Sequence, residues 1–296
     1  MRNAFIEELV AAAEVQDNIA LVVGDLGYGV VEPFAKRFPK RFFNAGVAEQ
    51  NMMGLCAGMA SEGYHVFAYS IANFPTFRCS EQIRNDVDYH NLPVTIVAVG
   101  GGLAYGSLGY SHHAVQDYAL IRVMPNMLIA APGDPMETRA CMRYLVTNPQ
   151  PSYLRLGKAG ELCLHASVPE VTPGKWLTLT PGAVTDSTII STGAPLAIAA
   201  KWLEGQEQFL GYALHSLPLW GMKYKSSQAT EVSKWERVVT LEDHLVDGGF
   251  GSWMMESLLM QSDLILRLRI KGLDPSVCGV VGCQETLNAF AGLAIS

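Results

Sequence analysis

Five short and mostly apolar segments in the first half of the chain constrain its fold more than any other feature. They are IALVVGD (19–25), HVFAYS (65–70), VTIVAVG (94–100), MLIAAPGD (127–134) and PSYLRLG (151–157). Continuous apolar runs of this length are typical of strands buried on both faces. Helical patterns separate several of them, at 74–90, 117–124 and 135–148. Strands that alternate with helices predict a parallel sheet covered by helices on both sides.

The pattern changes after residue 157, where glycine and proline become frequent. These residues are Gly157, Gly160, Pro169, Pro173, Gly174, Pro181 and Gly182. The alternation then resumes, with strands at 187–193, 209–217, 236–243 and 264–270 and helices at 195–204 and 248–261. Because glycine and proline interrupt regular structure, we expect a linker over residues 166–185. The predicted fold is α/β with two domains, residues 1–165 and 186–296, each a mostly parallel sheet flanked by helices.

The composition excludes several classes of partner. The net charge is −7 and no basic run occurs, which argues against nucleic acid and anionic membranes. No apolar run approaches the roughly 20 residues of a membrane span, and residues 1–16 do not have the basic flank of a signal peptide. The six cysteines form no C-x-x-C pair, which favours reduced core cysteines over disulfides or zinc. We therefore expect a cytoplasmic protein.

Glu49 stands within FFNAGVAEQNMMGLCAGMASEG (42–63), a stretch that is largely apolar and rich in small residues. Burying a carboxylate there costs on the order of several kcal/mol unless the group is paired or protonated. Three interpretations remain open: an acid in the first turn of a helix, a partner of an arginine, or a group with a chemical task. The small residues that follow suit a helix packed closely at an interface.

The glycine-rich loop VGGGLAYGSLG (99–109) follows a strand and is followed by His112 and His113. Ligands of open parallel sheets bind at the carboxyl ends of the strands, so this loop belongs to the expected site. It is not a dinucleotide-binding fingerprint, because it does not lead directly into a helix and position 122 is Arg instead of an acid. The histidines are either structural or catalytic, and we find no third residue that would complete a metal site.

Further candidates lie near other strand ends. Phe74 and Phe77 share a helical face, either as core residues or as a platform for a flat heteroaromatic ring. Arg155, near the end of a strand, suits a phosphate or a surface ion pair. The loop GDLGYG places Asp25 and Leu26 at the end of the first strand, which makes them candidate cofactor contacts.

In combination these segments resemble one family. VGDLGYG, GVAEQNM, YSIANF, SHHAVQD, MPNM, APGDP and PSYLRLGK resemble the pyrimidine-binding domain of transketolase-type thiamine diphosphate enzymes, and STIISTGAPLAIAAKWLE and VVTLEDHLVDGGFGS resemble the C-terminal domain of that family. The resemblance covers nearly the whole chain. It implies thiamine diphosphate as cofactor, acting as an electron sink, and the transfer of a two-carbon ketol unit from a ketose donor to an aldose acceptor.

The resemblance also implies a role for each candidate. Glu49 would hydrogen-bond a ring nitrogen of the aminopyrimidine and stabilise the imino tautomer, which removes the thiazolium proton. Such an acid must be desolvated, as the apolar surroundings suggest. Phe74 or Phe77 would stack on the pyrimidine. His112 would handle protons on the substrate oxygens beside His113, and Arg155 would bind a substrate phosphate.

Half of a thiamine site is missing from the sequence. The family binds the diphosphate and Mg²⁺ through a G-D-G…N motif, whereas neither G-D pair of this chain (24–25 and 133–134) is followed by glycine. We therefore expect these contacts from a separate N-terminal transketolase-type subunit, in an α2β2 heterotetramer. Gly100 and Leu108 stand where relatives carry a histidine and an aspartate. Losing these polar groups predicts a changed sugar preference, such as a modified sugar.

Two alternatives stay open. The β-subunit of a 2-oxoacid dehydrogenase shares the two-domain plan and the separate partner chain, and activity with pyruvate and a lipoyl acceptor would favour it. A non-catalytic subunit that stabilises a thiamine diphosphate enzyme is compatible with the changes at Gly100 and Leu108.

Overall fold

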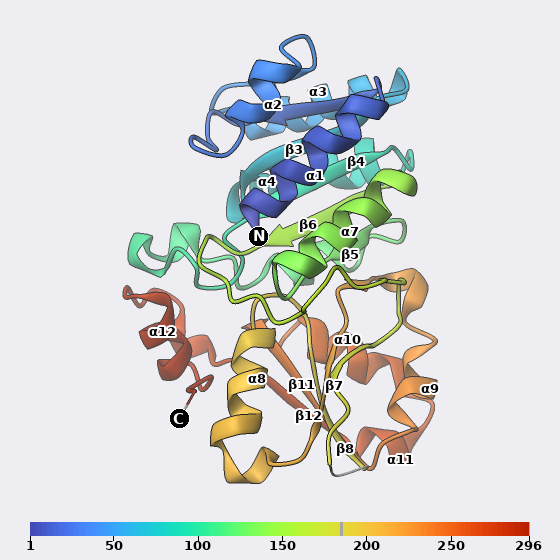
Figure 1. Cartoon of the computed structure of the whole chain (residues 1–296), viewed down its shortest axis with the longest axis vertical. Helices are drawn as coiled ribbons and strands as arrows, with labels where there is room; N and C mark the ends of the chain where they lie inside the picture. Colours follow the sequence, from blue (N-terminus) through green and yellow to red (C-terminus); the bar gives the residue numbers. More distant parts are fainter. Residues whose placement is uncertain (184–185, 296) are drawn as a thin grey trace.

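The computed structural model describes residues 1–183 and 186–295, and it consists of two helix-covered sheets that follow one another along the long axis (Figure 1). The first is a seven-stranded sheet in the order β10-β5-β6-β4-β3-β1-β2. Its strands are β1 (Ile19–Val23), β2 (Phe42–Asn44), β3 (His65–Ile71), β4 (Val94–Val99), β5 (Leu128–Ala130), β6 (Ser152–Leu156) and β10 (Leu219–Trp220). All neighbours are parallel except β10 and β5. The five strands predicted for the first half are confirmed.

Helices cover both faces of this sheet because side chains alternate along each strand. Leu21 packs into one core and Val22 into the other. The helices on the first face are α1 (Arg2–Val15), α2 (Glu32–Arg37) and α7 (Pro135–Thr147), and those on the second are α3 (Glu49–Ser61), α4 (Asn73–Arg78) and α6 (Asp117–Ile121).

The predicted helix over 74–90 is broken into three pieces. Helix α4 ends at Arg78, a single turn α5 (Ser80–Gln82) follows, and Ile83–Asp88 is π-helical. Such π-helical turns often lie near functional sites. Helix α4 begins at Asn73, directly after β3 ends at Ile71.

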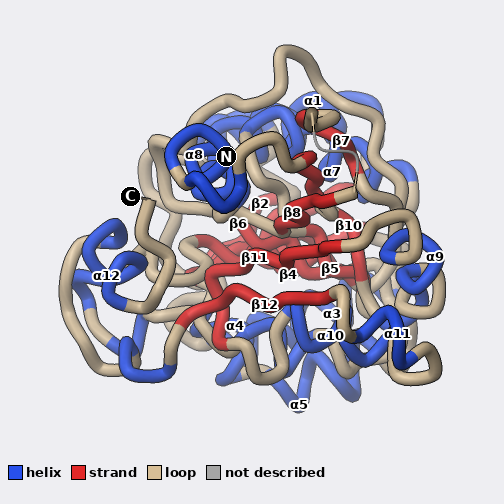
Figure 2. The backbone as a smooth tube through the Cα atoms, turned by 90° about the horizontal axis from the view of Figure 1, so that it is seen from below, coloured by secondary structure: helices blue, strands red, loops and turns tan. Residues whose placement is uncertain are grey.

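The second sheet has five strands in the order β12-β11-β8-β9-β7 (Figure 2). They are β7 (Leu177–Thr180), β8 (Ser187–Ser191), β9 (Ala213–Ser216), β11 (Arg237–Leu245) and β12 (Leu268–Leu273). Only the β7–β9 pair is antiparallel. The covering helices are α8 (Leu196–Gly205) and α12 (Gln284–Phe290) on one face and α9 (Gln228–Val232), α10 (Phe250–Ser257) and α11 (Ser262–Ile265) on the other. The mostly parallel α/β architecture of both halves is therefore confirmed.

The expected linker over 166–185 is wrong in part, because β7 lies within it and forms the edge of the second sheet. Its four residues alternate between half-buried and exposed positions, so they carry no continuous apolar run. The two halves are also joined by β10, a two-residue strand from the second half that completes the first sheet. Trp220 of β10 lies 5.1 Å from the rings of Tyr118 and Trp253, so one apolar core spans both sheets.

The cysteines follow the prediction only in part. All six are free, but only Cys56, Cys79 and Cys141 are buried, while Cys163 and Cys283 are exposed. In residues 1–183 and 186–295, no helix combines the length and the apolarity needed to cross a bilayer.

Candidate active site

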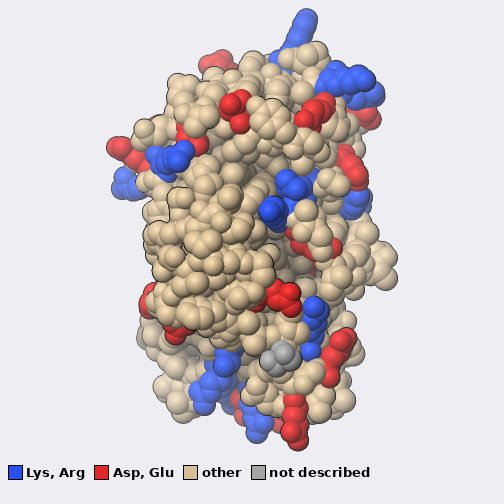
Figure 3. Space-filling model, turned by 90° about the vertical axis from the view of Figure 1, so that its left-hand side faces the viewer, with Lys and Arg blue, Asp and Glu red and all other residues tan. Residues whose placement is uncertain are grey.

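The loops that follow β1, β2, β3, β4 and β6 leave the same edge of the first sheet, because these strands are parallel. In Figure 1 this edge is on the left, where β6 ends. Figure 3 views the molecule from that side, and a broad area without charged side chains covers the left part of its middle, beside a group of charged side chains. The candidate residues gather at this edge.

Glu49 is the first residue of α3 and is only 5% exposed. Its Cγ lies near Gly24, the residue that follows β1. Its Oε1 accepts a hydrogen bond of 2.7 Å from Nη1 of Arg78. Both structural interpretations of the sequence are thus realised, since the acid lies in a first helical turn and pairs with an arginine. The chemical task, the third interpretation, stays a prediction, and the cation on this carboxylate is Arg78.

Arg78 connects the acid to an aromatic ring. Its guanidinium carbon lies 4.2 Å from the ring centroid of Phe74, one helical turn earlier in α4. The guanidinium therefore stacks on Phe74 while it donates to Glu49. Phe77 is on the same helix and is 44% exposed.

His112 lies beside this group, at the end of a short 3₁₀ turn (Tyr110–His112) in the loop after β4. Its ring contacts Phe74 edge-on, with centroids 5.1 Å apart. Burial lowers the pKa of His112, and the nearby His113 and Arg78 lower it further. A lowered pKa keeps the imidazole neutral at neutral pH, so one ring nitrogen can accept a proton and the other can donate one.

His113 is not a substrate contact, and the prediction that placed it there is wrong. It is 1% exposed, and its Nε2 lies 3.2 Å from the carbonyl oxygen of Gly106. It holds the loop from inside, which positions the neighbouring His112. Sequence alone could not separate the two adjacent histidines.

Asp25 and Leu26 lie in the loop after β1. The Asp25 carboxylate accepts hydrogen bonds from Asn44 (2.8 Å) and Tyr28 (3.1 Å), which lower its pKa. Its φ of 55° is in the left-handed region that few non-glycine residues adopt. Leu26 is half-buried against the core on the α1 face. Asn44 thus fixes a sharp turn directly after Gly24, next to Glu49.

Arg155 is buried, and its expected role as a phosphate ligand is contradicted. It is 3% exposed and donates to Asp117 (2.7 Å) and to Asp243 of β11 (2.5 Å). Its guanidinium also lies 4.4 Å from the ring centroid of Tyr118. Both carboxylates are distant in sequence, so the pattern SYLRLGK could not reveal them. Arg155 joins the two halves of the molecule.

Lys158, the last residue of the PSYLRLGK motif, was given no role from the sequence and is an exposed cation near the end of β6. Its Nζ lies 5.1 Å from the ring centroid of Tyr105, and it forms no ion pair with any residue in 1–183 or 186–295. The signal was its place two residues after the strand end. Leu108 is 54% exposed in the same loop as His112.

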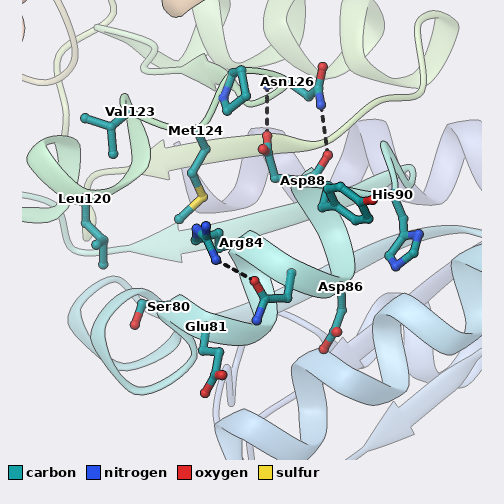
Figure 4. A pocket seen from close by; sticks show the side chains of 13 residues that line it. Ser80, Glu81, Arg84, Asp86, Asp88, His90, Leu120, Val123, Met124 and Asn126 are labelled. Carbon is teal, nitrogen blue, oxygen red and sulfur yellow. Dashed lines mark hydrogen bonds between the residues drawn. The ribbon is translucent and has the colours of Figure 1, made fainter.

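A separate pocket lies on the second face of the first sheet, between the π-helical segment and the residues after α6 (Figure 4). Asp88 and Asn126 line this pocket from its two sides. The Asp88 carboxylate accepts a 2.9 Å hydrogen bond from the backbone N–H of Asn126. Burial raises the pKa of Asp88. This pocket contains none of the predicted site residues. Within the described residues, no three His, Cys, Asp or Glu side chains are arranged to hold a metal ion.

The fold and the strand-end residues define a pyrimidine-binding domain followed by a second α/β domain. Residues 1–160 match the family described as the transketolase pyrimidine-binding domain. The chain is 35% identical over 296 residues to a putative transketolase C-terminal section of Methanocaldococcus jannaschii, covering 99% of this chain and 92% of that protein. It is 34% identical to one of the subunits of the apulose-4-phosphate transketolase of Phocaeicola vulgatus, covering 99% and 93%.

A solved structure described as a split-gene transketolase, inactive β4 tetramer, superposes with a TM-score of 0.85 at 31% identity, covering 99% of this chain and 94% of that one. The chain therefore belongs to the transketolase family. It corresponds to a separately encoded C-terminal section, and ketol transfer is the general function of the family.

Thiamine diphosphate, the cofactor that the family implies, can be tested against the residues present. A flat, positively charged group with N–H donors already lies on Phe74 and bonds Glu49, namely the guanidinium of Arg78. An aminopyrimidine is also flat and stacks on aromatic rings, and its ring nitrogens accept a hydrogen bond from a protonated carboxyl group. The acid and the ring therefore fit the pyrimidine half of the cofactor.

Proposed function

We propose that this chain is the C-terminal subunit of a split thiamine diphosphate-dependent transketolase, which transfers a two-carbon ketol unit once it is joined to a separate N-terminal subunit. The observation that carries the proposal is the arrangement of Glu49, Phe74 and His112 at one edge of a parallel sheet. Family membership supplies the reaction class, and this arrangement supplies the groups that the reaction needs.

In this proposal Glu49 binds a ring nitrogen of the aminopyrimidine, and Phe74 stacks on the ring. Phe74 is preferred to Phe77 because its ring lies beside the Glu49–Arg78 pair and the more exposed Phe77 forms no such contact in the described residues. When bound, the cofactor supplies an electron sink for the donor's carbon–carbon bond cleavage. Arg78 must then move away from Phe74.

His112 is the proposed proton carrier for the substrate oxygens. Its neutral ring at neutral pH can take a proton from a hydroxyl and return it. His113 fixes its loop and Asp25 with Leu26 shape the adjacent turn. Lys158 replaces Arg155 as the proposed cation for an anionic group of the sugar, because Arg155 is already bonded to two carboxylates.

The partner is proposed to bind the diphosphate and Mg²⁺, for which this chain carries no G-D-G…N motif. The β4 tetramer of the related split-gene transketolase is described as inactive, which supports the need for a second kind of subunit. The broad uncharged area at the left of Figure 3 suits burial against a partner. Gly54 and Gly58 on α3 face open space, so another backbone could approach closely there. An α2β2 heterotetramer meets these requirements.

The substrates are proposed to be phosphorylated or otherwise modified sugars. One relative is named for apulose 4-phosphate, a sugar phosphate. The apolar, exposed Leu108 in the loop of His112 presents no group that could hydrogen-bond a sugar hydroxyl. We also propose a cytoplasmic location, which the six free cysteines support.

The test is reconstitution. The chain is mixed with the N-terminal subunit from the same genome, thiamine diphosphate and Mg²⁺, and ketol transfer is measured with a panel of ketose donors and aldose phosphates. We expect turnover only in the mixture, and a loss of at least ~10²-fold for Glu49→Ala, the scale of acid–base catalysis. Unchanged melting temperature and assembly size of Glu49→Ala are the control for folding.

The alternatives predict other outcomes. Turnover of pyruvate with a lipoyl acceptor, and none of ketoses, would identify a 2-oxoacid dehydrogenase subunit. Full activity of the N-terminal subunit alone would make this chain a stabilising partner. Wild-type turnover in Glu49→Ala would refute the role of the acid.

A further inference from the structure

Tyr105 lies where a side chain on residue 100 would point. Gly100 follows β4 with φ +82°, and a Cβ atom built on it would lie 2.1 Å from Cε2 and 2.3 Å from Cδ2 of Tyr105. These distances are far below van der Waals contact. The glycine therefore serves two purposes, since it permits the left-handed backbone and leaves room for the phenol ring.

The ring of Tyr105 is held in place by the loop around it. The loop is closed by the paired backbone hydrogen bonds between Gly102 and Ala114, of 2.9 and 3.0 Å. Gly106 packs under Leu287 of α12, where even a methyl group would approach within 2.6 Å. The second domain thus supports the loop from below, and Tyr105 is not a freely moving surface residue.

Two of the neighbours of Tyr105 are the groups that the proposed function gives to the substrate, and Arg2 and Tyr69 also lie near its phenol. The ring centroid of His112 is 6.3 Å from that of Tyr105, and Nζ of Lys158 is 5.1 Å from it. Tyr105 is half-buried, and its hydroxyl forms no hydrogen bond with the side chains and backbone of residues 1–183 and 186–295. A half-buried phenol without a partner can still bond a ligand.

We propose that Tyr105 is a specificity-determining residue that contacts the carbon chain of a phosphorylated sugar between His112 and Lys158. This inference rests on the proposed function, in which His112 meets the reacting oxygen and Lys158 the phosphate. A sugar that spans the two passes the face and the hydroxyl of Tyr105. The ring packs against the C–H face of the sugar, and the hydroxyl bonds one of its hydroxyl groups.

The experiment uses the assembled enzyme with ribose 5-phosphate and the active aldose phosphates of the panel. Tyr105→Phe removes only the hydroxyl, Tyr105→Leu removes the ring, and Tyr110→Phe is the matched control, because its hydroxyl bonds Gln116 in the same loop. We expect KM to rise about tenfold in Tyr105→Phe with kcat changed less than about twofold, and kcat/KM to fall about 10²-fold in Tyr105→Leu. Tyr110→Phe should match the wild type.

Binding supplies a second measurement that does not depend on turnover. Sugar phosphates are titrated calorimetrically into the Glu49→Ala assembly, with Tyr105 either unchanged or replaced through Tyr105→Phe or Tyr105→Leu. The affinities should rank in the same order as the values of kcat/KM. Unchanged KM and Kd in both Tyr105 variants would overturn the inference, as would a loss that merely follows a lower melting temperature. A wild-type assembly that neither binds nor converts any sugar phosphate overturns the proposed function together with this inference. Activity that is insensitive to Tyr105 overturns the inference alone.

Discussion

Two arginines of this protein form the same kind of contact in opposite environments. Arg155 and Arg78 each donate to a carboxylate at 2.7 Å, and each lies just over 4 Å from the centroid of an aromatic ring. Arg155 is 3% exposed and its carboxylates are fully enclosed. Arg78 is 49% exposed, and only its partner Glu49 is buried.

The difference in exposure separates a structural contact from an exchangeable one. Removing one partner of an enclosed ion pair leaves an uncompensated charge in a low-dielectric interior, which costs about 3–5 kcal/mol. An exposed ion pair contributes only about 0–1 kcal/mol, and in the Arg78–Glu49 pair the exposed guanidinium is solvated by water when it leaves. Arg155 thus ties the two domains together, whereas the exposed Arg78 can leave Glu49. In the proposed function, Glu49 as a protonated acid then donates to a ring nitrogen of the pyrimidine.

The largest expected effect is on stability. Arg155→Met should lower the free energy of unfolding by about 3–5 kcal/mol, because Asp117 and Asp243 remain enclosed without a cation. Guanidinium denaturation followed by tryptophan fluorescence measures the loss. The control is Arg143→Met, which breaks an exposed pair with Glu8 and should cost less than about 1 kcal/mol. Equal losses in the free energy of unfolding for Arg155→Met and Arg143→Met would refute the distinction between enclosed and exposed ion pairs.

A smaller effect is expected on cofactor affinity. Arg78→Gln should tighten thiamine diphosphate binding to the assembled enzyme by roughly fivefold, or about 1 kcal/mol, because the pyrimidine no longer has to displace a guanidinium. Quenching of tryptophan fluorescence during a cofactor titration measures the affinity. Arg84→Gln removes the same charge from an exposed arginine bonded to Asn85, and it should leave the affinity unchanged.

The direction of the change in cofactor affinity in Arg78→Gln shows whether Arg78 leaves the site when the cofactor binds. Weaker binding in Arg78→Gln would mean that Arg78 remains beside the cofactor and helps to hold it. The pyrimidine would then have to stack on another ring, with Phe77 as the candidate. The same titration with Phe74→Leu and Phe77→Leu distinguishes the two rings.

Predictions from the sequence succeed where a local pattern decides the structure, and they fail where contacts between distant residues decide it. Eight strands were predictable because each carries an apolar run, and the strand predicted over 264–270 overlaps β12 only at 268–270 because α11 occupies its start. In contrast, β2, β7 and β10 are short edge strands that contacts from elsewhere in the chain stabilise. Glu49 and His112 were recognisable because their motifs are local. The ion pairs of Arg155 were not predictable, because Asp117 and Asp243 are 38 and 88 residues away along the chain. Burial likewise separated His113 from its neighbour, and no local pattern encodes burial.

The smallest expected effect concerns the proton on His112. Burial, His113 and Arg78 all lower the pKa of this histidine, so its neutral form extends below pH 6.5. Because Arg78 is one of the causes, Arg78→Gln should raise the pKa of His112, and the histidine should become protonated at higher pH. Titration of the imidazole proton resonances of the isolated chain measures this directly. Arg84→Gln should leave the titration in place. A His112 titration that is unchanged in Arg78→Gln would show that water already screens the exposed arginine. The contrast with Arg155 would then be one of burial alone, with no electrostatic link between Arg78 and His112.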